Sequence, residues 1–250
     1  MGAGNKKYIY GFHAVESRIR AAPSSVRDVY LDENRNDARS LRLIDLSQQY
    51  KINVSYVDQL VLRDLVPEAS HQGVVALTDA NLTLMNQGQL MKRCGDFELI
   101  VALDGVTDPR NLGAILRTAC GFGVDAVISP KDKSCGLTDV VEKTASGAAS
   151  VIPYVQVTNL ARSLRELKDE GFWIVGADGN ADQTISDLDL RGKFILVFGS
   201  EGSGLRRLTR ETCDFLARVP MAGKAIIDSL NVSVAVGICL YEANRQRKCA

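Results

Sequence analysis

Residues 98–104, Glu-Leu-Ile-Val-Ala-Leu-Asp, form an apolar run that ends in a carboxylate. Such a run is typical of a strand at the centre of a parallel sheet, where helices cover both faces. The segments after it alternate between apolar runs and helical periodicity, which predicts a mostly parallel, doubly wound α/β domain over residues 98–250. The expected strands are 98–104, 125–129, 151–157, 172–177, 194–198 and 215–219, and the expected helices are 112–122, 138–147, 160–170 and 205–213.

The last strongly apolar segment, DSLNVSVAVGICLY, spans residues 228–241. Its valines alternate as in a strand, whereas its apolar residues from Val232 to Ala243 also recur at helical spacing. We favour the helix, because the small residues within it allow another backbone to approach closely. Ser229 and Asn231 are cap-type residues at its front end, and they either cap the helix or form the floor of a site.

The first part of the chain, residues 1–77, is predicted to be a small α/β unit. Residues 78–97 are polar and weakly periodic, which indicates a linker with at most one helical turn. The two histidines, His13 and His71, stand in short polar motifs and are equally compatible with a structural role. The expected helices of this unit are 11–22, 37–50 and 58–65, and its expected strands are 26–31, 53–57 and 73–77.

Composition sets broad limits on the class of protein. Of 250 residues, 46% are hydrophobic and 24% charged, as in a globular protein, and 30 basic residues balance 30 acidic ones. Net charge therefore favours neither nucleic acid nor any other partner. The six cysteines form no Cys-x-x-Cys pair and no ligand-like cluster, which indicates reduced thiols and no metal. Without a signal peptide or a transmembrane segment, the protein is expected to be soluble and cytoplasmic.

In a doubly wound sheet, ligands bind beyond the carboxyl ends of the strands, so the loops after Asp104, Phe198 and Val219 are the candidate site. In the first loop, Asn111 stands at a predicted helix start and Arg117 follows six residues later. Their side chains point in different directions, so only a curved site uses both. The alternative is that Asn111 caps the helix and Arg117 covers its surface.

The second loop, Phe198-Gly-Ser-Glu-Gly-Ser-Gly204, has three glycines directly after a strand. Glycines there allow a ligand or another backbone to come close. The loop lacks the Gly-Lys-Ser/Thr of a P-loop, and the first strand is not followed by a Gly-x-Gly-x-x-Gly fingerprint. Glu201 is better suited to hold a hydroxyl or a cation than a phosphate.

Three motifs therefore occur in order, and each lies in one of these loops. They are Asn111-x5-Arg117, Phe198-Gly-Ser-Glu-Gly-Ser-Gly204, and Pro220-Met followed by Ser229-Leu-Asn-Val-Ser233. Together they resemble the three motifs of the SpoU-type 2′-O-ribose RNA methyltransferases of the SPOUT class. The chain departs from the family pattern between Pro220 and Ser229, where it is longer.

Shorter segments resemble the family members that methylate a guanosine ribose in large-subunit (23S) ribosomal RNA. They are Gly11-Phe-His-Ala-Val15, His71-Gln-Gly73 and Val157-Thr-Asn-Leu-Ala-Arg162. The resemblance implies methyl transfer from S-adenosylmethionine to a ribose 2′-hydroxyl. It also implies a trefoil knot in the C-terminal domain, a homodimer, and an N-terminal RNA-binding domain like that of some ribosomal proteins.

The resemblance also assigns site residues. Carried over position by position, the cofactor would be held by backbone at Gly199, Val219 and Leu230, and the catalytic set would be Asn111, Arg117, Glu201, Ser229 and Asn231. A guanidinium stays protonated, so Arg117 would hold an RNA phosphate and stabilise the developing alkoxide rather than act as a base. The other members of the set would orient Arg117 and the ribose, and no metal would be needed.

Three other functions remain to be weighed against this one. A tRNA 2′-O-methyltransferase would share the motifs. A non-catalytic ribosomal RNA-binding module of the same fold would be expected to lose Arg117, Glu201 or Asn231, yet all are present. A cysteine-dependent base methyltransferase attacks through a thiolate, and none of the six cysteines lies in the three loops.

Overall fold

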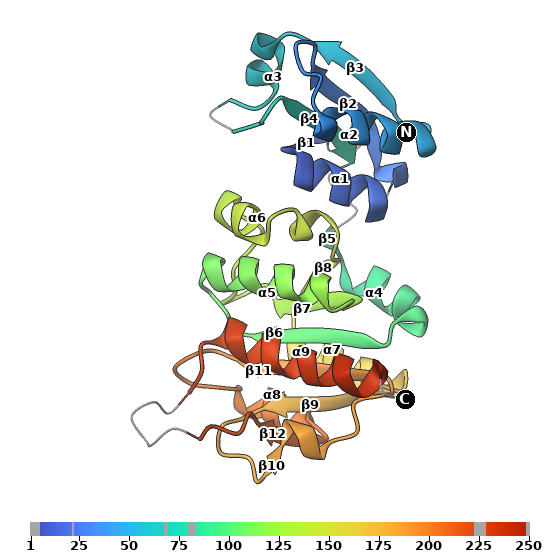
Figure 1. The fold of residues 1–250 in the computed structure, drawn as a ribbon. Helices are drawn as coiled ribbons and strands as arrows, with labels where there is room; N and C mark the ends of the chain where they lie inside the picture. The colour runs from blue at the N-terminus through green and yellow to red at the C-terminus, as the bar shows by residue number, and fades with distance from the viewer. Residues whose placement is uncertain (1–5, 22, 68–69, 80–83, 223–228, 249–250) are drawn as a thin grey trace. The chain divides into compact units, whose positions relative to one another are not determined.

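The computed structural model describes residues 6–21, 23–67, 70–79, 84–222 and 229–248. The chain divides into two compact units, Met1–Leu84 with Ser146–Val151, and Met85–Ala145 with Ile152–Ala250 (Figure 1). In the described ranges, no helix has both the length and the apolar character needed to cross a membrane. The longer segment between Pro220 and Ser229 falls largely on residues 223–228, which lie outside the described residues.

The first unit is built on a four-stranded mixed sheet in the order β1-β4-β2-β3. Strand β4 is antiparallel to β1 and β2, and β2 is parallel to β3. Asp37 caps α2 and Asp58 caps α3, each through its carboxylate, as the predicted helix starts required. The elements are β1 (Lys6–Tyr10), α1 (Phe12–Ala21), η1 (Pro23–Ser25), β2 (Val26–Asp32), α2 (Ala38–Gln49), β3 (Asn53–Val57), α3 (Gln59–Leu65) and β4 (Val74–Asp79).

Strand β1 was not predicted from the sequence. Its five residues, KKYIY, contain a run of only three hydrophobic side chains, Tyr8 to Tyr10. The strand exists because it pairs along its whole length with β4, and Ile9 joins the buried core of the unit. Pairing with a strand distant in the sequence therefore stabilises β1, and the local sequence pattern does not predict such pairing.

The described residues of the second unit form seven strands that are parallel throughout, in the order β10-β12-β9-β11-β6-β7-β8. The short strand β5 (Leu84–Met85) adds to the edge beside β8. The predicted α/β architecture with a parallel sheet is confirmed. The strands are β6 (Leu99–Asp104), β7 (Ala126–Pro130), β8 (Tyr154–Val157), β9 (Trp173–Ala177), β10 (Gln183–Thr184), β11 (Phe194–Gly199) and β12 (Phe215–Arg218).

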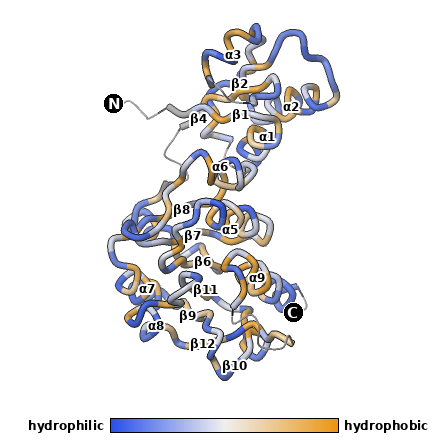
Figure 2. Tube along the Cα trace, turned by 90° about the vertical axis from the view of Figure 1, so that its left-hand side faces the viewer, coloured by the Kyte–Doolittle hydropathy of each residue, from blue (hydrophilic) through white to orange (hydrophobic). Residues whose placement is uncertain are grey.

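Helices cover both faces of this sheet (Figure 2). Helices α5 and α9 lie on one side of the strands and α7 and α8 on the other. Every residue of β6 is buried, as its position between two helical layers demands. The helices are α4 (Gln87–Arg93), α5 (Pro109–Gly121), α6 (Asp139–Ala145), α7 (Leu160–Asp169), α8 (Arg207–Thr212) and α9 (Val232–Lys248), with 3-10 turns η2 (Cys94–Asp96) and η4 (Ile185–Asp187). The 3-10 turn η3 (Ala148–Ser150) belongs to the first unit.

Besides the unpredicted strands β1 and β10, the structure differs from the sequence-based expectations in the linker and at the starts of β8 and α5. Within the predicted linker 78–97, residues 87–93 form a capped helix, and Leu90 and Cys94 are buried in the core of the second unit. Strand β8 begins at Tyr154 because residues 148–150 form a 3-10 turn. Helix α5 begins at Pro109, so it is longer than predicted. By contrast, the helix favoured over a strand at the end of the chain is confirmed as α9.

Candidate active site

Three segments that leave the carboxyl edge of the sheet build the site. Strand β6 pairs in parallel with β11, and in that register Asp104 lies opposite Gly199. The loop after β6 therefore starts beside the glycine loop, although ninety-five residues separate them in the sequence. The segment that leads into α9 supplies the third part, because α9 packs against α5 and β11.

The glycine loop closes on itself. Ser200 and Gly204 exchange two backbone hydrogen bonds, with N–O distances of 3.2 and 3.0 Å. A Cβ atom on Gly199 would lie 2.1 Å from the carbonyl carbon of Gly204, so no other residue fits at this position. The glycine that the motif places after β11 is thus required by backbone packing within the loop.

A buried carboxylate ties the first loop to the second. Asp104 is 1% exposed, and its Oδ2 accepts a hydrogen bond of 2.9 Å from the backbone N–H of Arg206. Its Oδ1 lies 3.5 Å from Nη1 of Arg206 and accepts no hydrogen bond from the described residues. Asp104 was not among the predicted site residues, although its place at the end of an apolar strand was the available signal.

The side chains of Asn111, Glu201 and Asn231 meet above this edge, one from each loop. Asn111 Nδ2 donates to Glu201 Oε1 over 2.9 Å, and Asn231 Nδ2 donates to the same oxygen over 2.6 Å. Asn231 Nδ2 also lies 3.0 Å from Oδ1 of Asn111. The structure thus joins one predicted residue from each motif into a polar cluster, which we call the amide–carboxylate cluster.

Asn111 is available for this cluster because it does not cap its helix. The cap is Asp108, whose carboxylate accepts a hydrogen bond from the backbone N–H of Arg110. Asn111 therefore lies within the first turn, with its side chain directed to Glu201. The alternative that Asn111 is a helix cap is wrong.

Asn231 caps its helix and also joins the amide–carboxylate cluster. Its Oδ1 accepts hydrogen bonds from the backbone N–H and the hydroxyl of Ser233, at 2.9 and 2.6 Å, which caps α9. Its Nδ2 is directed to the amide–carboxylate cluster. One amide group therefore fixes the start of α9 and links it to the other two loops.

The remaining predicted residues lie outside the cluster. Arg117 is exposed on α5 and makes no hydrogen bond or ion pair with any residue in the described ranges. Ser229 is also exposed, whereas Val219 and Leu230 are half-buried in the segments on either side of residues 223–228. The cluster thus brings together three of the predicted catalytic residues without Arg117 or Ser229.

The five cysteines that the structure describes are unsuited to nucleophilic catalysis. Burial raises the pKa of Cys213 and of Cys239 to about 12, which keeps both thiols protonated near neutral pH. Burial also raises the pKa of Cys94, Cys120 and Cys135. None of these five described cysteines makes a hydrogen bond with the amide–carboxylate cluster. A thiolate mechanism finds no support here.

Comparison with known proteins agrees with this geometry. Residues 98–241 match the SpoU rRNA Methylase family, and residues 8–83 match a family described as RNA 2'-O ribose methyltransferase substrate binding. The chain belongs to the SpoU rRNA methylase family. The first matched segment contains all three loops of the site, and the second lies in the first unit.

Individual relatives in this family cover almost the whole chain. The 23S rRNA (guanosine-2'-O-)-methyltransferase RlmB of Pseudomonas aeruginosa is 52% identical over 96% of this chain and 96% of its own. The same-named protein of Ralstonia nicotianae is 46% identical over the same shares. In fold, the chain resembles the SpoU methyltransferase AviRb from Streptomyces viridochromogenes with its cofactor AdoMet, at a TM-score of 0.73 and 22% identity, over 99% of this chain and 92% of that one.

Proposed function

We propose that this protein transfers a methyl group from S-adenosylmethionine to the 2′-hydroxyl of a guanosine ribose in 23S ribosomal RNA. The observation that carries the proposal is the 52% identity to a relative of that named activity, which extends over 96% of both chains. The amide–carboxylate cluster supports it, because a non-catalytic descendant would not be expected to preserve it. We place the reaction in the cytoplasm, since the substrate is ribosomal RNA.

The cofactor site that we propose lies between the glycine loop and the segments on either side of residues 223–228. Backbone groups at Gly199, Val219 and Leu230 would hold S-adenosylmethionine there. The fit is good, because the closed turn from Ser200 to Gly204 leaves the outer side of the loop open: a Cβ on Gly202 would meet no atom within 4 Å. When bound, S-adenosylmethionine supplies a sulfonium methyl group that is already activated toward nucleophiles.

The amide–carboxylate cluster would position the ribose. Both amide donors of the cluster bind Oε1 of Glu201, and Oε2 accepts no hydrogen bond from the described residues. We propose that Oε2 would accept a hydrogen bond from the 2′-hydroxyl, orient the hydroxyl oxygen for methyl transfer and take up the proton that this oxygen loses. Asn111 and Asn231 fix the carboxylate, and Ser229 would contact the same ribose.

Arg117 would act on the charge that develops at the ribose oxygen. The guanidinium remains protonated, so its role would be to bind an RNA phosphate and to stabilise the alkoxide. Its exposure on α5 and its lack of a partner among the described residues leave its donors available. We propose that RNA binding brings the reacting nucleotide between Arg117 and the cluster.

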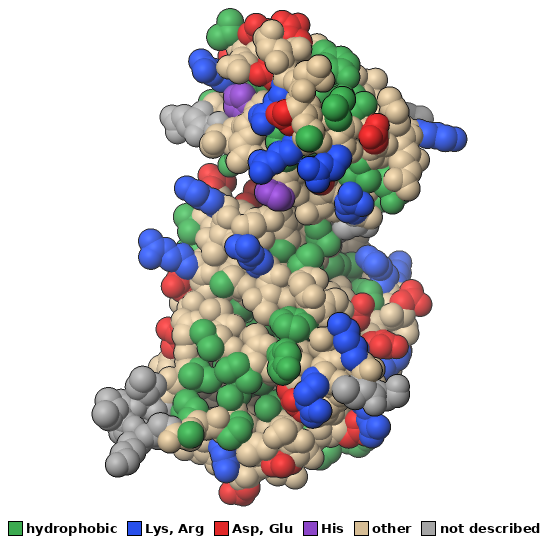
Figure 3. Space-filling model, in the orientation of Figure 1, with side chains coloured by type: hydrophobic (Ala, Val, Ile, Leu, Met, Phe, Trp, Pro, Cys, Tyr) green, Lys and Arg blue, Asp and Glu red, His purple; other side chains and the backbone are tan. Residues whose placement is uncertain are grey.

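We also propose a homodimer, in which helix α9 forms part of the contact. Val234, Ile238 and Tyr241 are 49%, 37% and 59% exposed, and their spacing puts them on one face of α9. Figure 3 shows hydrophobic side chains gathered on the face of the second unit where α9 lies. An apolar stripe of this kind is typical of a surface that a partner covers. The trefoil knot implied by the motifs stays a prediction.

Methyl transfer to purified RNA tests the proposed substrate. The protein, labelled S-adenosylmethionine, and either 23S ribosomal RNA stripped of protein or bulk tRNA would be incubated under single-turnover conditions. We expect label in the ribosomal RNA alone. Label in tRNA instead would favour the tRNA-modifying alternative. Cofactor binding without transfer to either RNA would favour a non-catalytic binding module.

A further inference from the structure

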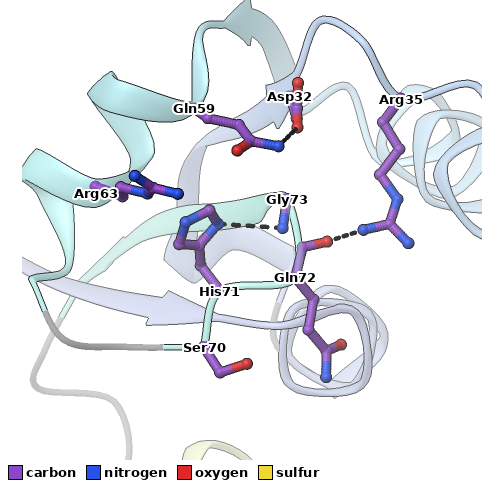
Figure 4. Close-up of a pocket in the computed structure, with 8 residues that line it drawn as sticks. All are labelled: Asp32, Arg35, Gln59, Arg63, Ser70, His71, Gln72 and Gly73. Atoms are coloured by element: carbon purple, nitrogen blue, oxygen red, sulfur yellow. Dashed lines mark hydrogen bonds between the residues drawn. The ribbon is translucent and has the colours of Figure 1, made fainter.

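The first unit contains a cavity of about 570 Å³ that lies outside the amide–carboxylate cluster. Three elements meet there: the end of β2, the exposed side of α3, and the turn before β4 (Figure 4). Its volume is in the range of small-molecule sites. The lining residues are Asp32, Arg35, Gln59, Arg63, Ser70, His71, Gln72 and Gly73.

The turn at 70–73 is held in one shape by the cavity's own residues. Gln72 and Gly73 both have positive φ angles, 53° and 83°, and the backbone N–H of Gly73 donates to Nδ1 of His71 over 3.1 Å. Arg35 donates to the carbonyl oxygen of Gln72 and lies 4.7 Å above the ring of Phe12. The His-Gln-Gly motif is thereby fixed before any ligand binds, which lowers the entropy cost of binding.

One wall of the cavity offers hydrogen-bond donors. Because Nδ1 of His71 accepts a hydrogen bond, the neutral imidazole carries its proton on Nε2. In Figure 4 that edge of the ring faces the guanidinium of Arg63. Arg63 is exposed and makes no hydrogen bond or ion pair with any residue that the structure describes. These two side chains form a donor pair suited to the oxygens of a phosphate.

Another part of the cavity lining, next to these donors, offers acceptors. Asp32 is 4% exposed, and its two oxygens accept hydrogen bonds from the Asn34 backbone N–H and from Nε2 of Gln59. The hydrogen bond from Gln59 contributes most to keeping the pKa of Asp32 below its usual value, and the bond from Asn34 adds to this effect. The carboxylate is therefore charged. A carboxylate has lone pairs for further donors, and the carbonyl of Gln59 adds another acceptor. Arg35 and Asp37 also lie nearby, but they are paired with each other.

A phosphate alone would use only the donor wall, whereas a nucleotide uses both. We propose that this cavity binds one unpaired nucleotide of the RNA substrate, with its phosphate on Arg63 and His71. The Watson–Crick edge of its base, which carries hydrogen-bond donors, faces Asp32 and Gln59. Unstacked bases are the usual targets of sequence-specific RNA recognition, because their edges are free. This inference rests on the proposed ribosomal RNA substrate, yet it concerns binding in the first unit and not methyl transfer.

Two variants of the full-length protein test the donor wall. In Arg63→Gln one cation is lost, and in His71→Asn the side-chain oxygen still accepts from Gly73 while Nε2–H is removed. Arg39→Gln, which removes an exposed cation of α2 away from the cavity, is the matched control. The probes are a 23S RNA fragment with a single-stranded loop and a duplex of equal length, titrated at several salt concentrations.

We expect Arg63→Gln to weaken binding of the looped RNA about tenfold, as loss of a hydrogen bond to a charged group predicts. The slope of log K against log salt should fall by about 0.7, which corresponds to one phosphate of a single strand. His71→Asn should weaken the same complex, and duplex binding should change little. Equal losses for Arg63→Gln and Arg39→Gln, or equal losses on duplex and loop, would overturn the inference.

A second measurement separates this inference from the proposed reaction. The probes are a series of looped RNAs, each of which lacks the base of one nucleotide. At one position, loss of the base should weaken binding by the wild-type protein but barely change binding by Arg63→Gln. If no position behaves so, the cavity holds no base and the inference fails. If the position exists but wild type transfers no methyl group to this RNA, the proposed function fails and the binding site stands.

Discussion

At the scale of single residues, the site depends on a few polar side chains that each make two kinds of contact. Asn231 caps α9 with its oxygen and binds Glu201 with its nitrogen. Glu201 receives both amide donors on one oxygen, which leaves the other available. Sequence reasoning selected Asn111, Glu201 and Asn231 through the three motifs. It could not show that they touch, because 120 residues separate the two asparagines and only the sheet register brings them together.

Asn231→Asp separates the two tasks of Asn231. The aspartate keeps an oxygen that caps α9, so the free energy of unfolding should change by less than about 0.5 kcal/mol. It replaces the donor to Glu201 by a second negative charge, so single-turnover methyl transfer should fall by a factor on the order of 10². Thermal unfolding and rapid-quench assays measure the two effects. Near-normal transfer would show that Asn231 is only a cap.

Arg117→Ala tests the charge proposed to act on the alkoxide. A preorganised contact that strengthens in the transition state contributes a factor on the order of 10²–10³ to the rate. The variant should therefore lose turnover far more than RNA affinity, and lysine should restore little because it lacks the planar fork. Arg165→Ala, an exposed arginine on α7, is the control. Turnover within about twofold of wild type would remove Arg117 from the site.

At the scale of elements, the parallel strands and the glycine loop position the site. Periodicity predicted most of the helices and strands, including α9, because their apolar faces are recorded locally in the sequence. It missed β1, whose existence depends on pairing with β4, and it took α4 for linker because the polar residues around Leu90 and Cys94 mask its buried face. The local sequence pattern does not predict helices and strands that are stabilised mainly by contacts with residues far away in the sequence.

Two glycines of the loop after β11 should respond oppositely to alanine. A Cβ on Gly199 would collide with the backbone of Gly204, so Gly199→Ala should cost about 1–3 kcal/mol and abolish S-adenosylmethionine binding. A Cβ on Gly202 meets nothing within 4 Å, so Gly202→Ala should stay within about 0.5 kcal/mol of wild type. Denaturant unfolding and calorimetry measure both. Similar behaviour of the two variants would contradict the described loop.

At the scale of the whole molecule, each unit has its own core and its own candidate site. The first unit offers a cavity with donor and acceptor walls, and the second offers the amide–carboxylate cluster. The division of labour that we propose is selection of RNA by the first unit and methyl transfer by the second. The cavity was not predicted, because only the folded first unit brings its residues together. Asp104 was not predicted either, although its place at the end of an apolar strand was a signal.

The proposed homodimer gives a prediction at this scale. Ile238→Glu places a charge in the apolar stripe of α9 and should convert dimers into monomers at micromolar concentration. Leu208→Glu, on α8 at the opposite face of the sheet, is 49% exposed in wild type and should leave the assembly unchanged. Analytical ultracentrifugation distinguishes the two. A dimer that survives Ile238→Glu would place the contact elsewhere, and a monomeric wild type would remove the homodimer proposal.

The most direct measurement is the position of the methyl group on the RNA. A ribose without a free 2′-hydroxyl resists alkaline cleavage of the next phosphodiester bond, so the modified nucleotide appears as a gap in the hydrolysis ladder. After reaction of the wild-type protein with S-adenosylmethionine and 23S ribosomal RNA, we expect the reaction to produce one gap in the ladder, at a guanosine. A methyl group on a base, a gap at another nucleotide type, or an unbroken ladder would contradict the account.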